Sequence, residues 1–336
     1  MATMYLEKDV NSQALDGKCV AVIGYGSQGR GQSLNLRDSG LNVILGLRKG
    51  GKSWDAAKSD GWEPRTIEDA TKEADIICLL TPDLAQPGTY KDAVEPHLKD
   101  GATILFAHGF NIRYESIVVP EKYNVIMVAP KGPGTLVRTL YEEGAGVPAL
   151  IAIHQDATGN AKELGLAFAW GIGSARAGII ETTFGEETET DLFGEQAVLC
   201  GGLSELIVAG WETLVEAGYQ PEVAYFECLH EVKLIVDLIF EGGIERMLEF
   251  ISDTAAWGDF VAGKRVIGAE SRAAMKELLA EIQDGRFAKR WMEEEANGYP
   301  DFKKQYAADC AHKIEVCGKE LRKHFSWLKK DEEVAS

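Results

Sequence analysis

The chain has 336 residues, 45% of them apolar, and a formal net charge of −18, so it is large enough for one or two globular domains. The acidic balance disfavours binding to nucleic acids or anionic lipid surfaces, and no apolar run approaches the roughly 18 residues of a membrane span. The N-terminal segment lacks the basic and apolar regions of a secretory signal, and the six cysteines are scattered, so we expect a cytoplasmic protein with free thiols.

The first half of the chain alternates short apolar segments with helical ones. Strands are predicted at residues 19–23, 42–45, 75–80, 102–107, 124–128 and 149–154. Runs that are short and almost entirely apolar are typical of strands buried on both faces. Helices predicted at 27–39 and 66–74 separate the earlier strands. This alternation predicts an α/β domain with a Rossmann-like, doubly wound parallel sheet over residues 1–182.

Strands disappear in the second half of the chain, from about Thr182 onward. Apolar residues recur there at helical spacing, and helices are predicted at 191–216, 221–241, 244–254 and 271–295. We therefore expect an all-α C-terminal domain over residues 183–328. The charged tail, residues 329–336, is expected to fray.

A glycine-rich loop follows the first predicted strand, with the sequence Gly24-Tyr25-Gly26-Ser27-Gln28-Gly29. In a loop of this kind the glycines permit a tight turn, and backbone N–H groups at the start of the next helix approach a pyrophosphate. The hexapeptide alone is weak evidence in a chain with 36 glycines, but here a strand precedes it and a helix follows. We predict a dinucleotide-binding loop, with a plain βα turn as the alternative.

The end of the second strand indicates which dinucleotide is bound. A chain that prefers NAD usually carries Asp or Glu there, to hold the ribose 2′-hydroxyl. This chain instead offers cationic and hydroxyl donors for a 2′-phosphate, from Arg48, Lys49, Lys52 and Ser53. The segment favours NADPH, and the alternative is a solvated basic loop.

Three later strands are followed by segments that supply polar groups. These segments are Asp83-Leu84-Ala85-Gln86 after the strand at 75–80, His108-Gly109-Phe110 after the strand at 102–107, and Lys131 to Gly134 after the strand at 124–128. Ligands of open α/β sheets bind at the carboxyl ends of strands, so His108 and Lys131 are candidate active-site residues. Residue type alone leaves a packing or solvent role about equally open.

Two pairs of carboxylates lie four residues apart on predicted helices: Asp191 with Glu195, and Glu227 with Glu231. Both pairs are in line with apolar residues such as Leu199 and Leu234, and we expect these stripes to face inward. Inward carboxylates need cations to neutralise them, and a set of oxygen ligands favours Mg²⁺. The spacing predicts a two-metal site, with two solvated acidic faces as the alternative.

Together these segments resemble the ketol-acid reductoisomerases of branched-chain amino-acid synthesis, in their short class with one helical domain. The resemblance extends to about Leu328. It rests on the glycine-rich loop, both carboxylate pairs, and three further segments: His108-Gly109-Phe110, Ala129-Pro130-Lys131-Gly132-Pro133-Gly134 and Ile251-Ser252-Asp253-Thr254. It implies a knotted all-α C-terminal domain. It also implies Mg²⁺-dependent alkyl migration of 2-acetolactate or 2-aceto-2-hydroxybutyrate, followed by NADPH-dependent reduction to a 2,3-dihydroxy acid.

The resemblance also implies roles for individual residues. It makes Asp191, Glu195, Glu227 and Glu231 ligands of two magnesium ions, Ser252 a substrate contact, and His108 and Lys131 catalytic. It assigns the cofactor to the residues Tyr25 to Gln28, Arg48, Ser53, Asp83 to Gln86, and Gly134. Many relatives carry serine where this chain has Gly51, which removes one possible donor to a 2′-phosphate.

The same resemblance implies a homodimer in which each active site is shared between two subunits. Asp191 and Glu195 of one chain would meet Glu227, Glu231 and Ser252 of the other. Two other interpretations stay open from sequence. A metal-independent β-hydroxyacid dehydrogenase would leave the carboxylate pairs without a role, and a non-catalytic nucleotide-sensing dimer would bind NADPH without turnover.

Overall fold

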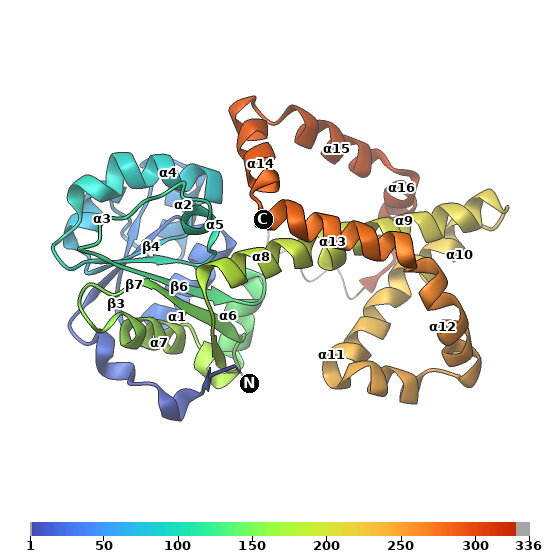
Figure 1. Ribbon diagram of the computed structural model, residues 1–336, viewed down its shortest axis with the longest axis horizontal. Coiled ribbons are helices and arrows are strands. Elements are labelled where there is room, and N and C mark those ends of the chain that lie inside the picture. Colours follow the sequence, from blue (N-terminus) through green and yellow to red (C-terminus); the bar gives the residue numbers. More distant parts are fainter. Residues whose placement is uncertain (1, 327–336) are drawn as a thin grey trace. The chain divides into compact units, whose positions relative to one another are not determined.

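The computed structural model describes residues 2–326, which form two compact units (Figure 1). The N-terminal unit extends to Thr190 and the C-terminal unit begins at Asp191. The domain boundary predicted at 182/183 stays a proposal. It falls just before helix α8 (Phe184–Gly194), and the division between the two units falls inside that helix. The predicted tail at 329–336 lies outside the described residues.

The N-terminal unit is built on an eight-stranded sheet in the order β1-β8-β7-β6-β5-β4-β2-β3. Its strands are β1 (Met4–Tyr5), β2 (Cys19–Ile23), β3 (Asn42–Gly46), β4 (Ile76–Leu79), β5 (Thr103–Phe106), β6 (Asn124–Pro130), β7 (Ala149–Gln155) and β8 (Ile179–Glu181). Neighbouring strands from β3 to β6 are parallel, which confirms the predicted doubly wound sheet. The pairs β6–β7 and β1–β8 are antiparallel, so the sheet is mixed rather than wholly parallel.

The six predicted strands are all present, whereas the two short strands β1 and β8 were not predicted. Every residue of β2, β4, β5 and β6 is buried, because helices cover both faces of the sheet. The helices of this unit are α1 (Ser27–Asp38), α2 (Lys52–Ser59), α3 (Ile67–Glu73), α4 (Gln86–Thr89), α5 (Phe110–Arg113), α6 (Gly134–Glu142) and α7 (Ala161–Gly171).

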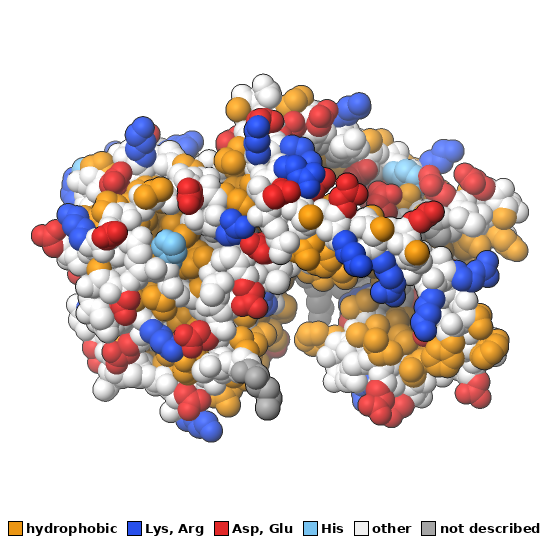
Figure 2. Space-filling view, in the orientation of Figure 1, with side chains coloured by type: hydrophobic (Ala, Val, Ile, Leu, Met, Phe, Trp, Pro, Cys, Tyr) orange, Lys and Arg blue, Asp and Glu red, His pale blue; other side chains and the backbone are white. Residues whose placement is uncertain are grey.

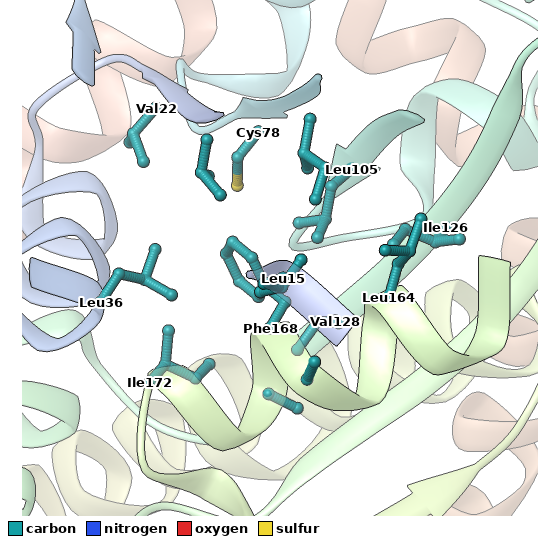
Figure 3. Packing of buried hydrophobic residues seen from close by; sticks show 14 of the residues in the cluster. Leu15, Val22, Leu36, Cys78, Leu105, Ile126, Val128, Leu164, Phe168 and Ile172 are labelled. Atoms are coloured by element: carbon teal, nitrogen blue, oxygen red, sulfur yellow. The ribbon is translucent and has the colours of Figure 1, made fainter. Parts of the chain in front are cut away.

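A layer of hydrophobic side chains joins the sheet to the helices on each face. On one face, Phe168 and Leu164 of α7 pack with strand residues such as Cys78 and Leu105 (Figure 3). On the other face, Ala70 of α3 and Phe184 of α8 join a second cluster. Burial of these apolar side chains stabilises the sheet by roughly 25 cal/mol per Å² removed from water. A rigid sheet thereby fixes the loops at its carboxyl edge.

The order of the sheet creates a switch point between β2 and β4. The chain leaves β2 toward β3 on one side and returns to β4 on the other, and open α/β sheets bind ligands at such a point. Gly24, which follows β2, has φ +103° there, and a Cβ on it would lie 2.8 Å from the carbonyl oxygen of Leu80. Only glycine allows the two loops to approach this closely.

The C-terminal unit is all-helical in its described part, as predicted, although its helices differ in detail. They are α9 (Gly201–Glu216), α10 (Pro221–Tyr225), α11 (Glu231–Phe250), α12 (Asp253–Val266), α13 (Ala269–Gln283), α14 (Arg286–Ala296), α15 (Pro300–Ala311) and α16 (Lys313–Arg322). The single helix predicted at 271–295 is wrong. The chain breaks between α13 and α14 because Gly285 takes φ +82°, a left-handed conformation that ends a helix. Helix α11 is kinked at Gly242 and Gly243.

Large apolar side chains of the C-terminal unit are exposed. Figure 2 shows hydrophobic side chains gathered over α11 and α12. We call this surface the apolar face, formed by Leu234, Phe240, Ile244, Phe250, Trp257 and Phe260. The prediction that the carboxylate stripes face inward is therefore wrong within one chain: Leu199 is 66% and Leu234 54% exposed. A further stretch, Phe184–Glu216, has the length and composition of a membrane span, although only 6% of its apolar window is buried in this chain.

Candidate active site

The glycine-rich loop joins β2 to the N-terminus of α1. Gly26 is the residue before the helix, and it offers no side-chain hydrogen bond to the first N–H groups. A Cβ on Gly26 would meet nothing within 4 Å, whereas one on Gly29 would lie 2.3 Å from the Gly24 carbonyl oxygen. The loop therefore leaves open space beside a set of uncapped N–H groups, and that arrangement suits a pyrophosphate.

The side chain of Tyr25 turns away from this open space into the protein. Its hydroxyl donates to Oδ2 of Asp60 at 2.8 Å and accepts a hydrogen bond from Nε1 of Trp62 at 3.0 Å. Arg30 holds both oxygens of Asp60. Burial and the hydrogen bond to Asp60 raise the pKa of Tyr25 well above its ordinary value. Tyr25 thus ties the glycine-rich loop to the end of α2, and only its backbone is left to face a cofactor.

The predicted cofactor-specificity segment begins at the end of β3 and continues into α2. Arg48 and Lys52 are exposed and Ser53 is half-buried. Gly51 is the residue before α2 and gives its N-terminus no side-chain cap. The first turn of α2 therefore combines uncapped N–H groups with a hydroxyl and two nearby cations, a set of donors that suits an anion.

The loop after β4 is held by its own amide side chains. Gln86, 5% exposed, donates to the carbonyl oxygen of Thr81 at 2.8 Å. Asn111 of α5 donates to the carbonyl oxygen of Asp83 at 2.9 Å and to Oε1 of Gln86 at 3.0 Å. The Asp83 carboxylate lies 3.7 Å from Nδ1 of His108. The loop that was predicted to bind the cofactor also positions an acidic group beside the predicted catalytic histidine.

Glu187 of α8 brings the two predicted catalytic residues together, and sequence analysis missed it. Its side chain is 1% exposed. Nζ of Lys131 donates to Oε1 at 2.8 Å, the backbone N–H of Gly109 donates to Oε2 at 3.0 Å, and Nε2 of His108 lies 3.9 Å from Oε2. A buried carboxylate of this kind is stable only with cationic and hydrogen-bonding partners. His108, Lys131 and Glu187 form one polar cluster at the carboxyl ends of β5 and β6.

Local sequence explains how α8 delivers Glu187. Thr183 caps the helix, since its Oγ1 accepts from the backbone N–H of Glu186, and the Thr-x-x-Glu spacing is typical of a helix start. Gly109 allows the helix to approach, because a Cβ there would lie 2.3 Å from Oγ1 of Thr188. The capping signal was available from the sequence, but it did not show that this turn of the helix is buried.

The predicted metal ligands continue from this cluster along the chain. Asp191 lies one turn after Glu187 on α8, and Glu195 begins the π-helical turn η7 (Glu195–Leu199). Glu227 lies in a second π-helical turn, η8 (Phe226–His230), and Glu231 begins α11. Such turns often mark functional sites. All four ligands offer carboxylate oxygen, which suits Mg²⁺.

The structure does not gather all of the predicted metal and substrate residues in one chain. Among the described residues, no three of the four carboxylates bring their oxygens within 4.8 Å of one another. Ser252 is the N-cap of α12, and its Oγ accepts from the backbone N–H of Ala255 at 3.2 Å. Its assignment as a substrate contact therefore stays a prediction.

A mostly parallel sheet with a dinucleotide loop at its switch point, beside a lysine, a histidine and a buried carboxylate, defines a nicotinamide-dependent oxidoreductase. Comparisons with known proteins identify its family. Residues 14–178 match the acetohydroxy acid isomeroreductase NADPH-binding domain, and residues 184–327 match the ketol-acid reductoisomerase C-terminal domain. The chain belongs to the ketol-acid reductoisomerases and has their activity.

Solved structures agree with this assignment. An NADH-preferring ketol-acid reductoisomerase from an uncultured archaeon is 47% identical, with a TM-score of 0.94 over 96% of this chain and 99% of its own. Two other structures share the fold alone. They are a semialdehyde dehydrogenase NAD-binding protein from Cupriavidus necator (18% identity, TM-score 0.61, 80% and 99% covered) and a pyrroline-5-carboxylate reductase from Coxiella burnetii (13%, 0.56, 80% and 98%). The resemblance drawn from sequence is confirmed, and the two other interpretations are set aside.

Proposed function

We propose that the chain converts 2-acetolactate or 2-aceto-2-hydroxybutyrate into a 2,3-dihydroxy acid, with NADPH as reductant and two Mg²⁺ ions at each site. The observation that carries this proposal is the pairing of Lys131 with the fully buried Glu187, at the sheet edge that also bears the dinucleotide loop. The chain offers suitable groups for each cofactor. Uncapped N–H groups at the start of α1 can bind the phosphates of the dinucleotide, and carboxylate oxygens, such as that of Asp191 on α8, can ligate Mg²⁺.

Bound Mg²⁺ would supply Lewis-acid chemistry, acidifying the tertiary hydroxyl and polarising the ketone of the substrate. The protein's own residues hold and move protons beside it. The 2.8 Å hydrogen bond to Glu187 fixes the position of Nζ of Lys131, from where it can stabilise a developing alkoxide or relay a proton. His108, between Asp83 and Glu187, orients water or the nicotinamide.

The metal proposal is tested by Glu195→Gln, which keeps size and helix propensity but removes one charged ligand. We expect isomerisation to be lost, while reduction of an already rearranged 2-keto acid falls less steeply, because migration depends more on both ions. Glu121→Gln, at an exposed position in the N-terminal unit, is the control. Equal, near-normal rates for both steps would show that Glu195 is only a solvated side chain.

NADPH is the proposed cofactor because the end of β3 is followed by Arg48 and Ser53 and not directly by the acid that usually reads the ribose, the first acidic residue after β3 being Asp55 in the first turn of α2. The archaeal relative prefers NADH, so the choice needs its own test. Ser53→Asp would place a negative charge against the 2′-phosphate and lower the NADPH to NADH efficiency ratio. Ser59→Asp, exposed at the other end of α2, adds the same charge without that effect. An unchanged ratio in Ser53→Asp would exclude this segment as the phosphate reader.

We propose that two chains share each active site. The apolar face exposes six large hydrophobic side chains, and only 6% of the apolar window within Phe184–Glu216 is buried in one chain. Exposed apolar surface of this kind marks an interaction site, and its position on the helices that carry the carboxylate pairs favours a second copy of the chain over lipid. Among the described residues of one chain, no three of the four carboxylates gather into a metal-sized group. In the dimer, Asp191 and Glu195 of one subunit complete the site with Glu227, Glu231 and Ser252 of the other.

Coexpression of two inactive variants tests the shared site. Asp191→Asn and Glu227→Gln chains are each expected to be inactive alone. In a mixed dimer one site carries both lesions and the other is intact, so random pairing should restore about a quarter of wild-type activity. Chains that demonstrably pair but stay inactive would refute sharing.

We also propose a cytoplasmic location. All six cysteines are free, and burial raises the pKa of Cys19 and of Cys78, which keeps both thiols protonated. Free thiols of this kind are typical of a reducing compartment. Fractionation of the native host, with a disulfide-bonded periplasmic marker as control, tests this location.

A further inference from the structure

Both ends of the Gln28 side-chain amide are bound within the protein. Its Nε2 donates to the carbonyl oxygen of Gly132 at 2.9 Å, and its Oε1 accepts from Nε2 of Gln32 at 2.9 Å. Gln32 lies one turn further along α1 and is fully buried, so it holds the amide in one orientation. Gln28 belongs to the glycine-rich loop, yet its amide is directed to the residue that follows Lys131.

The turn that carries Lys131 is packed directly on the start of α1. A Cβ on Gly134 would lie 2.2 Å from the backbone of Ser27, and one on Gly31 would lie 2.4 Å from the carbonyl oxygen of Gly134. The backbone N–H of Lys131 donates to Pro148 at 2.8 Å. These contacts fix the two ends of the turn, and the Gln28 amide fixes its middle at Gly132.

We propose that Gln28 is a positioning residue for Lys131 and does not use its side chain to bind the dinucleotide. The amide sets the Lys131–Gly134 turn, which sets where Nζ of Lys131 meets Glu187. This inference rests on the catalytic role proposed for Lys131. Through the Gln28 side chain, the glycine-rich loop is linked to the turn that carries Lys131. A small displacement of a catalytic group can lower the reaction rate greatly.

The test separates cofactor affinity from turnover. Gln28→Met keeps the length of the side chain and removes both hydrogen bonds without adding a charge beside the loop proposed to bind the pyrophosphate. We expect this variant to lower kcat at saturating NADPH by about tenfold or more, since a displacement near 1 Å can cost about a hundredfold. The NADPH dissociation constant, measured by fluorescence titration, should change by less than about threefold, which also shows that the loop is folded. Gln32→Met, which leaves the bond to Gly132, should have a much smaller effect on kcat.

Two outcomes would overturn the inference. A dissociation constant that weakens about tenfold while kcat at saturation is kept would assign the amide to the cofactor. Near-normal values of both quantities would show that the bond to Gly132 has no effect on the reaction. Lys131→Met is measured in parallel. If that variant keeps its activity, the proposed role of Lys131 fails, whereas an inactive Lys131→Met beside a normal Gln28→Met refutes only the positioning role.

Discussion

Replacement of Tyr25 by phenylalanine tests whether this residue is an anchor of the fold or a cofactor contact. The Tyr25 side chain is 5% exposed, and its hydroxyl joins two partners, Asp60 and Trp62. Phenylalanine keeps the buried ring and removes both hydrogen bonds. Asp60 retains its two bonds from Arg30 and is partly open to water, but Nε1 of Trp62 loses its acceptor.

The size of the effect follows from these partners. A neutral hydrogen bond contributes about 1 kcal/mol and one to a charged group about 1.5–3 kcal/mol, and water can replace part of the loss at Asp60. We expect Tyr25→Phe to lower the unfolding free energy of the N-terminal unit by about 2 kcal/mol. For a unit of this size, that corresponds to a fall in Tm of about 4–8 °C. The NADPH dissociation constant should change by less than about threefold, because the hydroxyl faces Asp60.

The matched control is Tyr90→Phe. Tyr90 is also buried, at 4% exposure, but its hydroxyl has no hydrogen-bond partner within the part of the chain that the structure describes. Removing that hydroxyl should leave Tm unchanged or raise it, because a polar group is no longer buried without a partner. Differential scanning calorimetry of the holoenzyme compares the two variants. Equal shifts in Tm, or an NADPH affinity that falls in Tyr25→Phe without a change in Tm, would refute the anchoring role.

Three further predictions concern Glu187, Gly109 and Asp60. Glu187→Gln leaves one acceptor for the two donors of Lys131 and Gly109, so kcat should fall about tenfold or more in a coupled assay, with the exposed Glu186→Gln as control. Gly109 has an ordinary φ of −85°, but the Cβ added in Gly109→Ala would press against Thr188. This variant should lose about 1–3 kcal/mol of unfolding free energy, measured with urea. Gly88→Ala, whose Cβ meets open space, should lose none. Hydrogen bonds from Arg30, and then from Tyr25, lower the pKa of Asp60 against the opposing effect of burial. The stability that Asp60 contributes is therefore present above the unfolded pKa and lost below about pH 4, so wild type should lose more Tm on acidification than Asp60→Asn.

Local patterns were enough to predict the N-terminal sheet and its loop. Four of its six predicted strands are wholly buried and mostly apolar. The glycine pattern is partly local, since Gly29 packs against the Gly24 carbonyl oxygen, whereas the approach of Gly24 to Leu80 depends on the neighbouring strand. Strands β1 and β8 have only two and three residues, too few to show a period. In the second half, the break at Gly285 was hidden because helical periodicity continues on both sides of it.

The active-site cluster was only partly predictable, for a physical reason. His108 and Lys131 were found because each follows a strand, and the strands of a parallel sheet end at one edge. Glu187 has no such marker. Its burial depends on how α8 packs against Gly109, a contact between residues 78 positions apart. The carboxylate stripes were predicted to face inward but are exposed in one chain. Apolar periodicity identifies the face of a helix that is suited to packing, and it does not say whether the partner belongs to the same chain.

The fold does not explain why Glu187 is buried, whereas the proposed reaction does. Taking a carboxylate out of water costs several kcal/mol. A lysine and a backbone N–H offset much of that cost, but a buried ion pair gives the fold no more stability than well-packed apolar side chains of the same volume. Sheet and helices already bury two large apolar clusters, so the fold gains little from a charge at this position. What the charge provides is a Lys131 side chain held at 2.8 Å and fixed in direction, next to the loop proposed to bind the reductant. Gly109 donates its backbone N–H to Glu187, and Gln28 donates to the residue after Lys131, so neighbouring segments hold the pair on both sides. If Lys131 has the proposed catalytic role, the stability lost by burying Glu187 is the cost of fixing that side chain in place.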